Sequence, residues 1–106
     1  MNLHKYLKDN KKEIIDRWFS AIVASYPDKT GKYYKQKHKQ FTNPVGYTIS
    51  KEINIIYDEI VNPGQPEVIE HAMENIIKIR AVQDFSATAA CNFVFELKDI
   101  VREAIR

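Results

Sequence analysis

Apolar residues recur at intervals of three and four along most of this chain, which is the spacing of one face of an α-helix. No stretch of useful length alternates with the period of two that marks a strand. Short runs containing Asn, Pro, Gly or Ser separate the apolar segments, as expected where helices end. The pattern predicts five helices, over residues 3–9, 10–25, 44–61, 66–81 and 86–105. The predicted fold class is therefore all-α, a compact bundle of about five helices in a single domain over residues 1–106.

Three sequence signals indicate where helices begin. Asn10 with Glu13 three residues later resembles a capping box, in which each side chain bonds an otherwise unpaired backbone amide. Asn43-Pro44 is typical of an N-cap followed by a first-turn proline, because the fixed φ of proline suits that position. Ser86 is placed to cap the last helix.

The last predicted helix carries an apolar arc of about 200°, wider than the stripe of a helix buried on one side. The arc consists of Ala87, Ala90, Cys91, Phe93, Val94, Leu97, Ile100, Val101, Ala104 and Ile105. Two interpretations stay open: the helix lies at the centre of the fold, or a second copy of the chain covers its other side. In the second case the predicted dimer-interface residues are Phe93, Leu97, Ile100 and Ala104. Cys91 is expected in the core as a small apolar side chain.

Charged and amide side chains lie among apolar ones at residues 79–86, between the last two predicted helices. Arg80, Gln83 and Asp84 can form a structural clasp, in which Arg80 bridges to Asp84 or to an acid of another helix and Gln83 bonds unpaired backbone groups. Alternatively, Arg80 holds a small anion or a partner's carboxylate through two parallel hydrogen bonds. Lys98 lies within the apolar arc and is expected to be paired or to extend to the surface. Arg80, Gln83, Asp84 and Lys98 are the predicted ligand- or partner-binding residues.

The 106 residues carry a formal net charge of +2, which is unevenly spread. Residues 1–43 hold ten Lys or Arg against four Asp or Glu, and residues 44–106 hold six against ten. The single cysteine excludes an internal disulfide. The chain has no apolar run long enough to span a membrane and no secretory signal at its start. These features predict a cytoplasmic protein with no membrane contact.

Two groups of residues that could bind a ligand are interpreted as solvated instead. Glu67, His71 and Glu74 fall opposite the apolar face, whereas metal ligands in helix bundles point inward, so no metal is expected. The five lysines between residues 29 and 39 could bind phosphate groups, but the following helices are net acidic, which disfavours nucleic acid as a partner. The histidines lack the apolar pocket of a haem ligand, and no cofactor is expected.

Sequence blocks over nearly the whole chain carry a family resemblance. They are Trp18, Ala24-Ser25-Tyr26-Pro27, Phe41-Thr42-Asn43-Pro44-Val45-Gly46-Tyr47, Ile79-Arg80-Ala81-Val82-Gln83-Asp84-Phe85-Ser86 and Leu97-Lys98. In order and spacing these blocks resemble the RsbRD amino-terminal domain family (RsbT co-antagonist). The resemblance implies a helical input module of stress-signalling proteins, similar to globin-like input domains that lack haem and pair as dimers. Family members are typically fused to a STAS domain, and the end at Arg106 predicts a stand-alone form without one.

The residues and the resemblance together predict a non-enzymatic regulatory or sensory domain with no catalytic residue. It is expected to act through contact with a protein partner, whose identity the sequence does not reveal, and through homodimerisation. Two other functions stay open, namely sensing of a small ligand in a pocket near Arg80 and contact with nucleic acid through residues 29–39.

Overall fold

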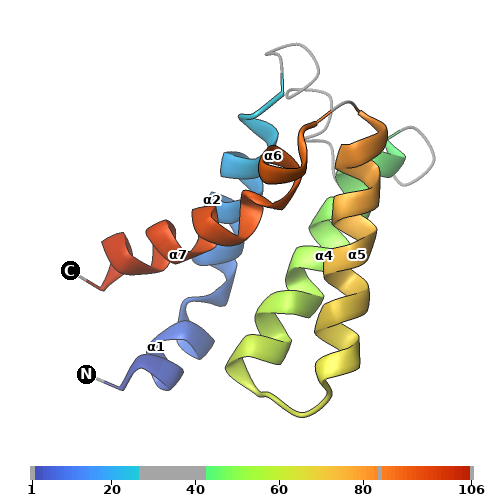
Figure 1. The fold of residues 1–106 in the computed structure, drawn as a ribbon. Coiled ribbons are helices and arrows are strands. Elements are labelled where there is room, and N and C mark those ends of the chain that lie inside the picture. The colour runs from blue at the N-terminus through green and yellow to red at the C-terminus, as the bar shows by residue number, and fades with distance from the viewer. Residues whose placement is uncertain (1, 27–42, 84, 106) are drawn as a thin grey trace.

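Helices account for nearly all the regular structure of this chain, which a computed structural model describes over residues 2–26, 43–83 and 85–105. Within these ranges there are six helices and no strand (Figure 1). They are α1 (Leu3–Asp9), α2 (Lys11–Val23), α4 (Pro44–Val61), α5 (Pro66–Val82), α6 (Ala87–Cys91) and α7 (Phe93–Ala104). The predicted all-α class is confirmed.

Two helix pairs make up most of the packing. Helices α4 and α5 run side by side in opposite directions, joined by residues 62–65, and α7 crosses α2 on the other side of the molecule (Figure 1). Helix α2 also contacts α4, so the two pairs enclose a common interior. The two ends of the chain lie on the same side of the molecule (Figure 1).

The hydrophobic core lies between α2, α4, α5 and α7. Its buried members are Ile14, Ile15, Trp18, Phe19, Ile22, Val23, Ile49, Ile53, Ile56, Tyr57, Val61, Ala72, Ile76, Phe93, Leu97 and Ile100. The indole Nε1 of Trp18 donates to the carbonyl of Phe93 at 2.7 Å, and the two rings stack with centroids 6.4 Å apart. Because a buried indole N–H needs an acceptor, this bond fixes the start of α7 against α2.

The predicted helix starts are confirmed at two of three positions. The side chain of Asn43 accepts from the amide of Gly46, and that of Ser86 accepts from the amide of Ala89, both at 3.1 Å. The capping box predicted at Asn10 is wrong. Its side chain donates to the carbonyl of Tyr6 at 2.9 Å and so helps to end α1, while making no capping bond to α2.

The last predicted helix is not continuous. It is divided into α6, which ends at Cys91, and α7, which begins at Phe93. The prediction that Cys91 lies in the core is wrong, since this residue is exposed. The division changes the direction of the helix axis (Figure 1), so the apolar positions of α6 and α7 no longer form one arc.

Tyr57 connects the first helix to the core. It lies on α4, and its hydroxyl donates to the carbonyl of Leu7 at 2.6 Å. Burial raises the pKa of Tyr57 from 10.0 to about 12, and Tyr6 and Asp58 act in the same direction. Folding therefore favours the neutral, protonated form of the Tyr57 side chain.

We expect Tyr57→Phe to lower the free energy of unfolding by about 1 kcal/mol near neutral pH, because it removes one hydrogen bond. The raised pKa means that this phenol stabilises the fold fully below pH 10.0, and that its contribution is lost as the pH rises towards about 12. Urea denaturation over this alkaline range should show a steeper loss of stability in the natural protein than in Tyr57→Phe. Parallel curves for the two proteins would contradict the assignment.

Candidate functional site

The candidate site lies where the last predicted helix is broken, next to the end of α5. In a continuous α-helix, the carbonyl of Ala89 would accept from the amide of Phe93, four residues on. Here it accepts from the amide of Asn92 at 3.3 Å and from Nη2 of Arg80 at 3.1 Å. The amide of Glu96 donates to the carbonyl of Asn92 and starts the ladder of α7. A side chain inserted into the hydrogen-bond ladder is an established cause of helix kinks.

Arg80 is among the most buried residues of the chain, with 1 % of its surface exposed. Besides Ala89, its Nη2 reaches Oγ of Ser25 at 3.4 Å, just after α2. The guanidinium carbon lies 4.3 Å from the ring centroid of Phe85 and 5.7 Å from that of Tyr26. Aromatic faces attract cations, most strongly where water is excluded. Arg80 thus contacts the ends of α2 and α5 and the body of α6.

Gln83 takes part in the same group of side chains. The hydroxyl of Tyr26 donates to Oε1 of Gln83 at 2.7 Å, and the Tyr26 ring meets the Phe85 ring edge to face at 5.3 Å. Asp84, the predicted partner of Arg80, lies outside the described residues. Among the described acids, none is within ion-pair distance of Arg80.

Three buried polar atoms near the break have no hydrogen-bond partner among the described residues. They are Nε and Nη1 of Arg80 and Oε2 of Glu96. A guanidinium grips a carboxylate in two-point fashion through Nη2 together with either Nε or Nη1. Nη2 bonds Ala89 and Ser25, whereas Nε and Nη1 bond none of the described residues. Arg80 thus links helix ends through a carbonyl and a hydroxyl instead of the acid that the predicted clasp required. Binding of an anion by Arg80 stays a prediction.

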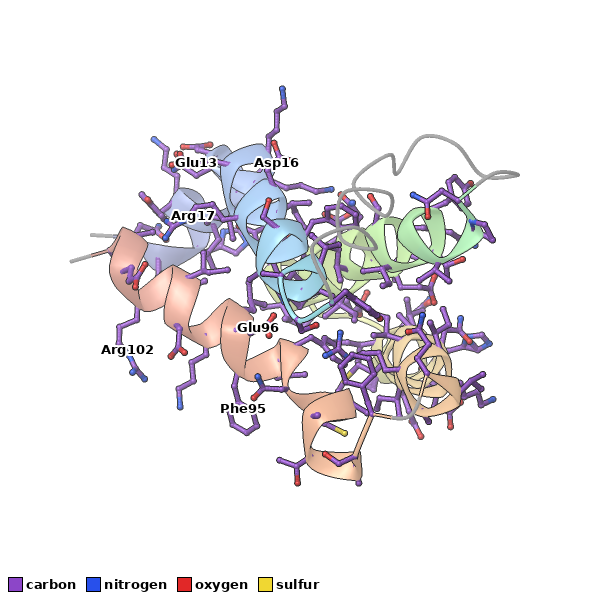
Figure 2. The ribbon with its side chains drawn as sticks, turned by 90° about the horizontal axis from the view of Figure 1, so that it is seen from above. Glu13, Asp16, Arg17, Phe95, Glu96 and Arg102 are labelled. Atoms are coloured by element: carbon purple, nitrogen blue, oxygen red, sulfur yellow. The ribbon has the colours of Figure 1, made fainter. Side chains whose placement is uncertain are left out.

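Glu96 faces the interior from α7. Burial raises the pKa of its carboxyl group above 4.5, and the nearby Arg80 charge and a hydrogen bond from Asn92 oppose this shift. Figure 2 shows Glu96 and Phe95 on opposite sides of α7. A half-buried acid that faces a buried arginine without touching it gives the site a titratable group.

Most of the residues predicted to form a dimer interface lie in the core of the single chain instead of on its surface. Phe93, Leu97 and Ile100 are buried in the core of the single chain, and Ala104 is half-buried, so this side of α7 is not free for a second copy. For these residues the other interpretation of the sequence holds, in which this side of the last helix is buried within the fold. The carbonyl of Ala104 accepts from the hydroxyl of Tyr6 at 3.3 Å.

The other side of α7 is exposed, and we call it the outer face of α7. It consists of Val94, Phe95, Lys98, Asp99 and Arg102. Lys98 is exposed, so of the two outcomes expected from the sequence its side chain extends to the surface. Phe95 has 62 % of its surface exposed, and in Figure 2 it points away from the rest of the molecule, as does Arg102.

Sequence reasoning missed Tyr26, Phe95 and Glu96 as site residues. One signal was present for Phe95: Phe93, Val94 and Phe95 are consecutive, and three successive helical residues span too wide an angle to face one core. Glu96 and Tyr26 gave no comparable signal, since their roles depend on contacts with residues far away in the sequence.

The described part of the chain gives little support to the other site types considered. It holds no group of three or more His, Cys, Asp or Glu side chains placed to bind a metal ion. None of its helices has the length and apolar content needed to cross a membrane. The lysine-rich residues 29–39 lie outside the described residues, so the expectation that nucleic acid is disfavoured stays a prediction.

Comparison with known proteins gives one match. The model of the family described as the RsbT co-antagonist protein rsbRD N-terminal domain matches residues 12–106. The match covers all the described helices except α1 and the first residue of α2. Searches of curated proteins and of solved structures found no match.

We expect Arg80→Met to lower the free energy of unfolding by about 1.5–3 kcal/mol, the usual contribution of hydrogen bonds made by a charged group. Methionine keeps the apolar stem and removes the guanidinium. Urea denaturation measures the difference. Lys78→Met is the matched control, because Lys78 is an exposed cation of the same helix, α5, and does not belong to the outer face of α7. A loss no larger than that of the control would show that the guanidinium does not hold the helix ends together.

We expect Glu96→Gln to stabilise the protein at neutral pH. Because folding raises the pKa of Glu96, its protonated form favours folding below about 4.5, and that contribution is lost as the pH rises. The stability advantage of the variant should therefore shrink as the pH falls towards 4. Stability measured against pH tests this, with the exposed Glu74→Gln as control. If Glu96→Gln were less stable than the natural protein at neutral pH, the charged form of Glu96 would stabilise the fold. That result would contradict the assignment of Glu96 as a buried acid without a partner for its charge.

Proposed function

The chain belongs to the family of the RsbT co-antagonist protein rsbRD N-terminal domain, and we propose that it is a non-enzymatic regulatory module that acts through protein contact and pairs with a second copy of itself. The family is one of regulatory signalling domains, and its description names a protein, RsbT, as the object of antagonism. A cytoplasmic location, expected from the sequence, is part of the proposal.

The observation that carries the proposal is the outer face of α7. Phe95 exposes 62 % of its surface and Val94 exposes 40 %, although the opposite side of the same helix supplies Phe93 and Leu97 to the core. Large aromatic side chains are enriched at the centres of protein interfaces. An exposed phenylalanine on a helix that is rigidly packed on its other side is well suited to such a contact.

The charges around Phe95 are arranged so that the face can pair with itself. Lys98 and Asp99 are adjacent and opposite in sign, and Arg102 lies seven residues beyond Phe95, on the same side of the helix. Two copies of α7 packed antiparallel about a twofold axis between residues 98 and 99 would place Lys98 against Asp99 of the partner subunit. The same arrangement would place Phe95 against Arg102 of the partner subunit, a cation–π pair. Twofold dimers use one self-complementary surface in this way.

A second candidate function, sensing of a small polar ligand near Arg80, is supported by the unpartnered buried atoms of Arg80 and Glu96. Such a ligand would contact Nε or Nη1 singly, because Nη2 is occupied. It would raise the melting temperature by mass action, in a variant that cannot dimerise as well as in the natural protein.

We expect sedimentation velocity to show a monomer–dimer equilibrium for the natural protein, and Phe95→Ser to weaken it by about tenfold or more, as truncation of a central aromatic residue does. Val82→Ser is the matched control, since Val82 exposes 85 % of its surface but lies on α5, away from the outer face of α7. The control should associate as the natural protein does.

A charge swap tests the orientation of the pair. Lys98→Asp and Asp99→Lys should each weaken the dimer by placing like charges together, and the double variant should restore it. A natural protein that stays monomeric at high micromolar concentration would contradict the dimer. If the dimer persisted in all these variants, its interface would lie on another part of the chain.

A further inference from the structure

A groove between α4 and α5 lies on the part of the molecule that the outer face of α7 does not use. It is open to solvent and has a volume of about 390 Å³, and its apolar walls are formed by Ile55 of α4 and by Val68 and Ala72 of α5. Glu52 of α4 and Asn75 of α5 also line it. A groove of this size accepts one long side chain.

Glu52 is the unusual residue of this groove. Only 3 % of its surface is exposed, and its Oε2 accepts from Nδ2 of Asn75 at 2.6 Å. Among the described residues, no basic side chain is within ion-pair distance of it. Acids are almost never this buried unless they are paired, because removing a carboxylate from water without a counter-charge is costly. The groove therefore contains a negative charge that lacks a cation.

The mouth of the groove does not supply that cation. Lys51 and Glu67 both line it and are opposite in sign, so their charges offset each other. His71, also at the groove, lies 3.4 Å through Nδ1 from the amide nitrogen of Asn75 and is exposed. The buried charge of Glu52 therefore determines the sign of the interior.

We propose that the groove between α4 and α5 receives a lysine or arginine side chain from a partner protein, with its charged head against Glu52 and its aliphatic stem against Ile55, Val68 and Ala72. Such side chains have an apolar stem and a cationic end. The groove offers apolar walls to the stem and a carboxylate to the cationic end. A metal ion fits less well, because the described residues provide no group of three ligands there. The inference rests on the proposed function in that it assumes a protein partner.

The test uses the ¹⁵N-labelled chain of 106 residues and an amide-shift titration with N-acetyl-lysine N-methylamide, a mimic of a lysine within a chain. We expect saturable shifts at the amides of Val68, Ala72 and Asn75. Glu52→Gln keeps an acceptor for Asn75 but removes the charge, and should weaken binding by about tenfold or more. Glu70→Gln is the matched control, because Glu70 is an exposed acid of α5, the other helix of the groove, and does not line the groove.

A second variant covers the case in which Glu52→Gln perturbs the fold. Ile55→Lys places an ammonium group beside Glu52 from within the chain, and should raise the melting temperature and abolish binding of the probe. Absence of saturable shifts, shifts outside the groove, or equal binding by Glu52→Gln in an unaltered fold would overturn the proposal. Tighter binding of free 1,5-diaminopentane than of the lysine mimic would assign the groove to small amines and overturn it as well. Dimerisation through Phe95 does not enter this titration, so the two proposals can fail separately.

Discussion

The hydrogen bond from Arg80 to the carbonyl of Ala89 determines how the last third of the chain is built. It occupies an acceptor that a continuous helix would use for the amide of Phe93, and the helix is broken at that point. A charged hydrogen bond of this kind is worth only about 1.5–3 kcal/mol, yet it is made by one of the most buried side chains of the chain, where hydrogen bonds are strengthened by the low dielectric. The contacts of the same guanidinium with Tyr26 and Phe85 keep it in place.

The two sides of α7 follow from that break. After Asn92 the helix axis takes a new direction (Figure 1), and Phe93, Leu97 and Ile100 are then directed into the core beside Trp18. Phe95 and Lys98 are left on the surface as a result. The surface that we propose as a binding face is thus produced by the same interaction that completes the core.

Rules that act over three or four residues predicted much of this fold. The caps at Asn43 and Ser86, the all-α class and the burial of Arg80 follow from local side-chain chemistry and from helical periodicity. The bonding partner of Arg80 could not be predicted, because a backbone carbonyl inside a helix is normally occupied. The break was not predicted, because it depends on a hydrogen bond from Arg80, which lies on another helix. The exposure of Lys98 and the burial of Phe93 depend on the direction of α7 after the break, so the sequence left open whether the core or a second copy covers the apolar side of that helix.

The most direct test of this account is the orientation of α6 relative to α7, measured from residual dipolar couplings in the natural protein and in Arg80→Met. We expect two distinct axes in the natural protein. In the variant the carbonyl of Ala89 becomes available to the amide of Phe93, and the two axes should move towards one continuous helix. An unchanged angle between α6 and α7 in a folded Arg80→Met protein would contradict the central role given to Arg80.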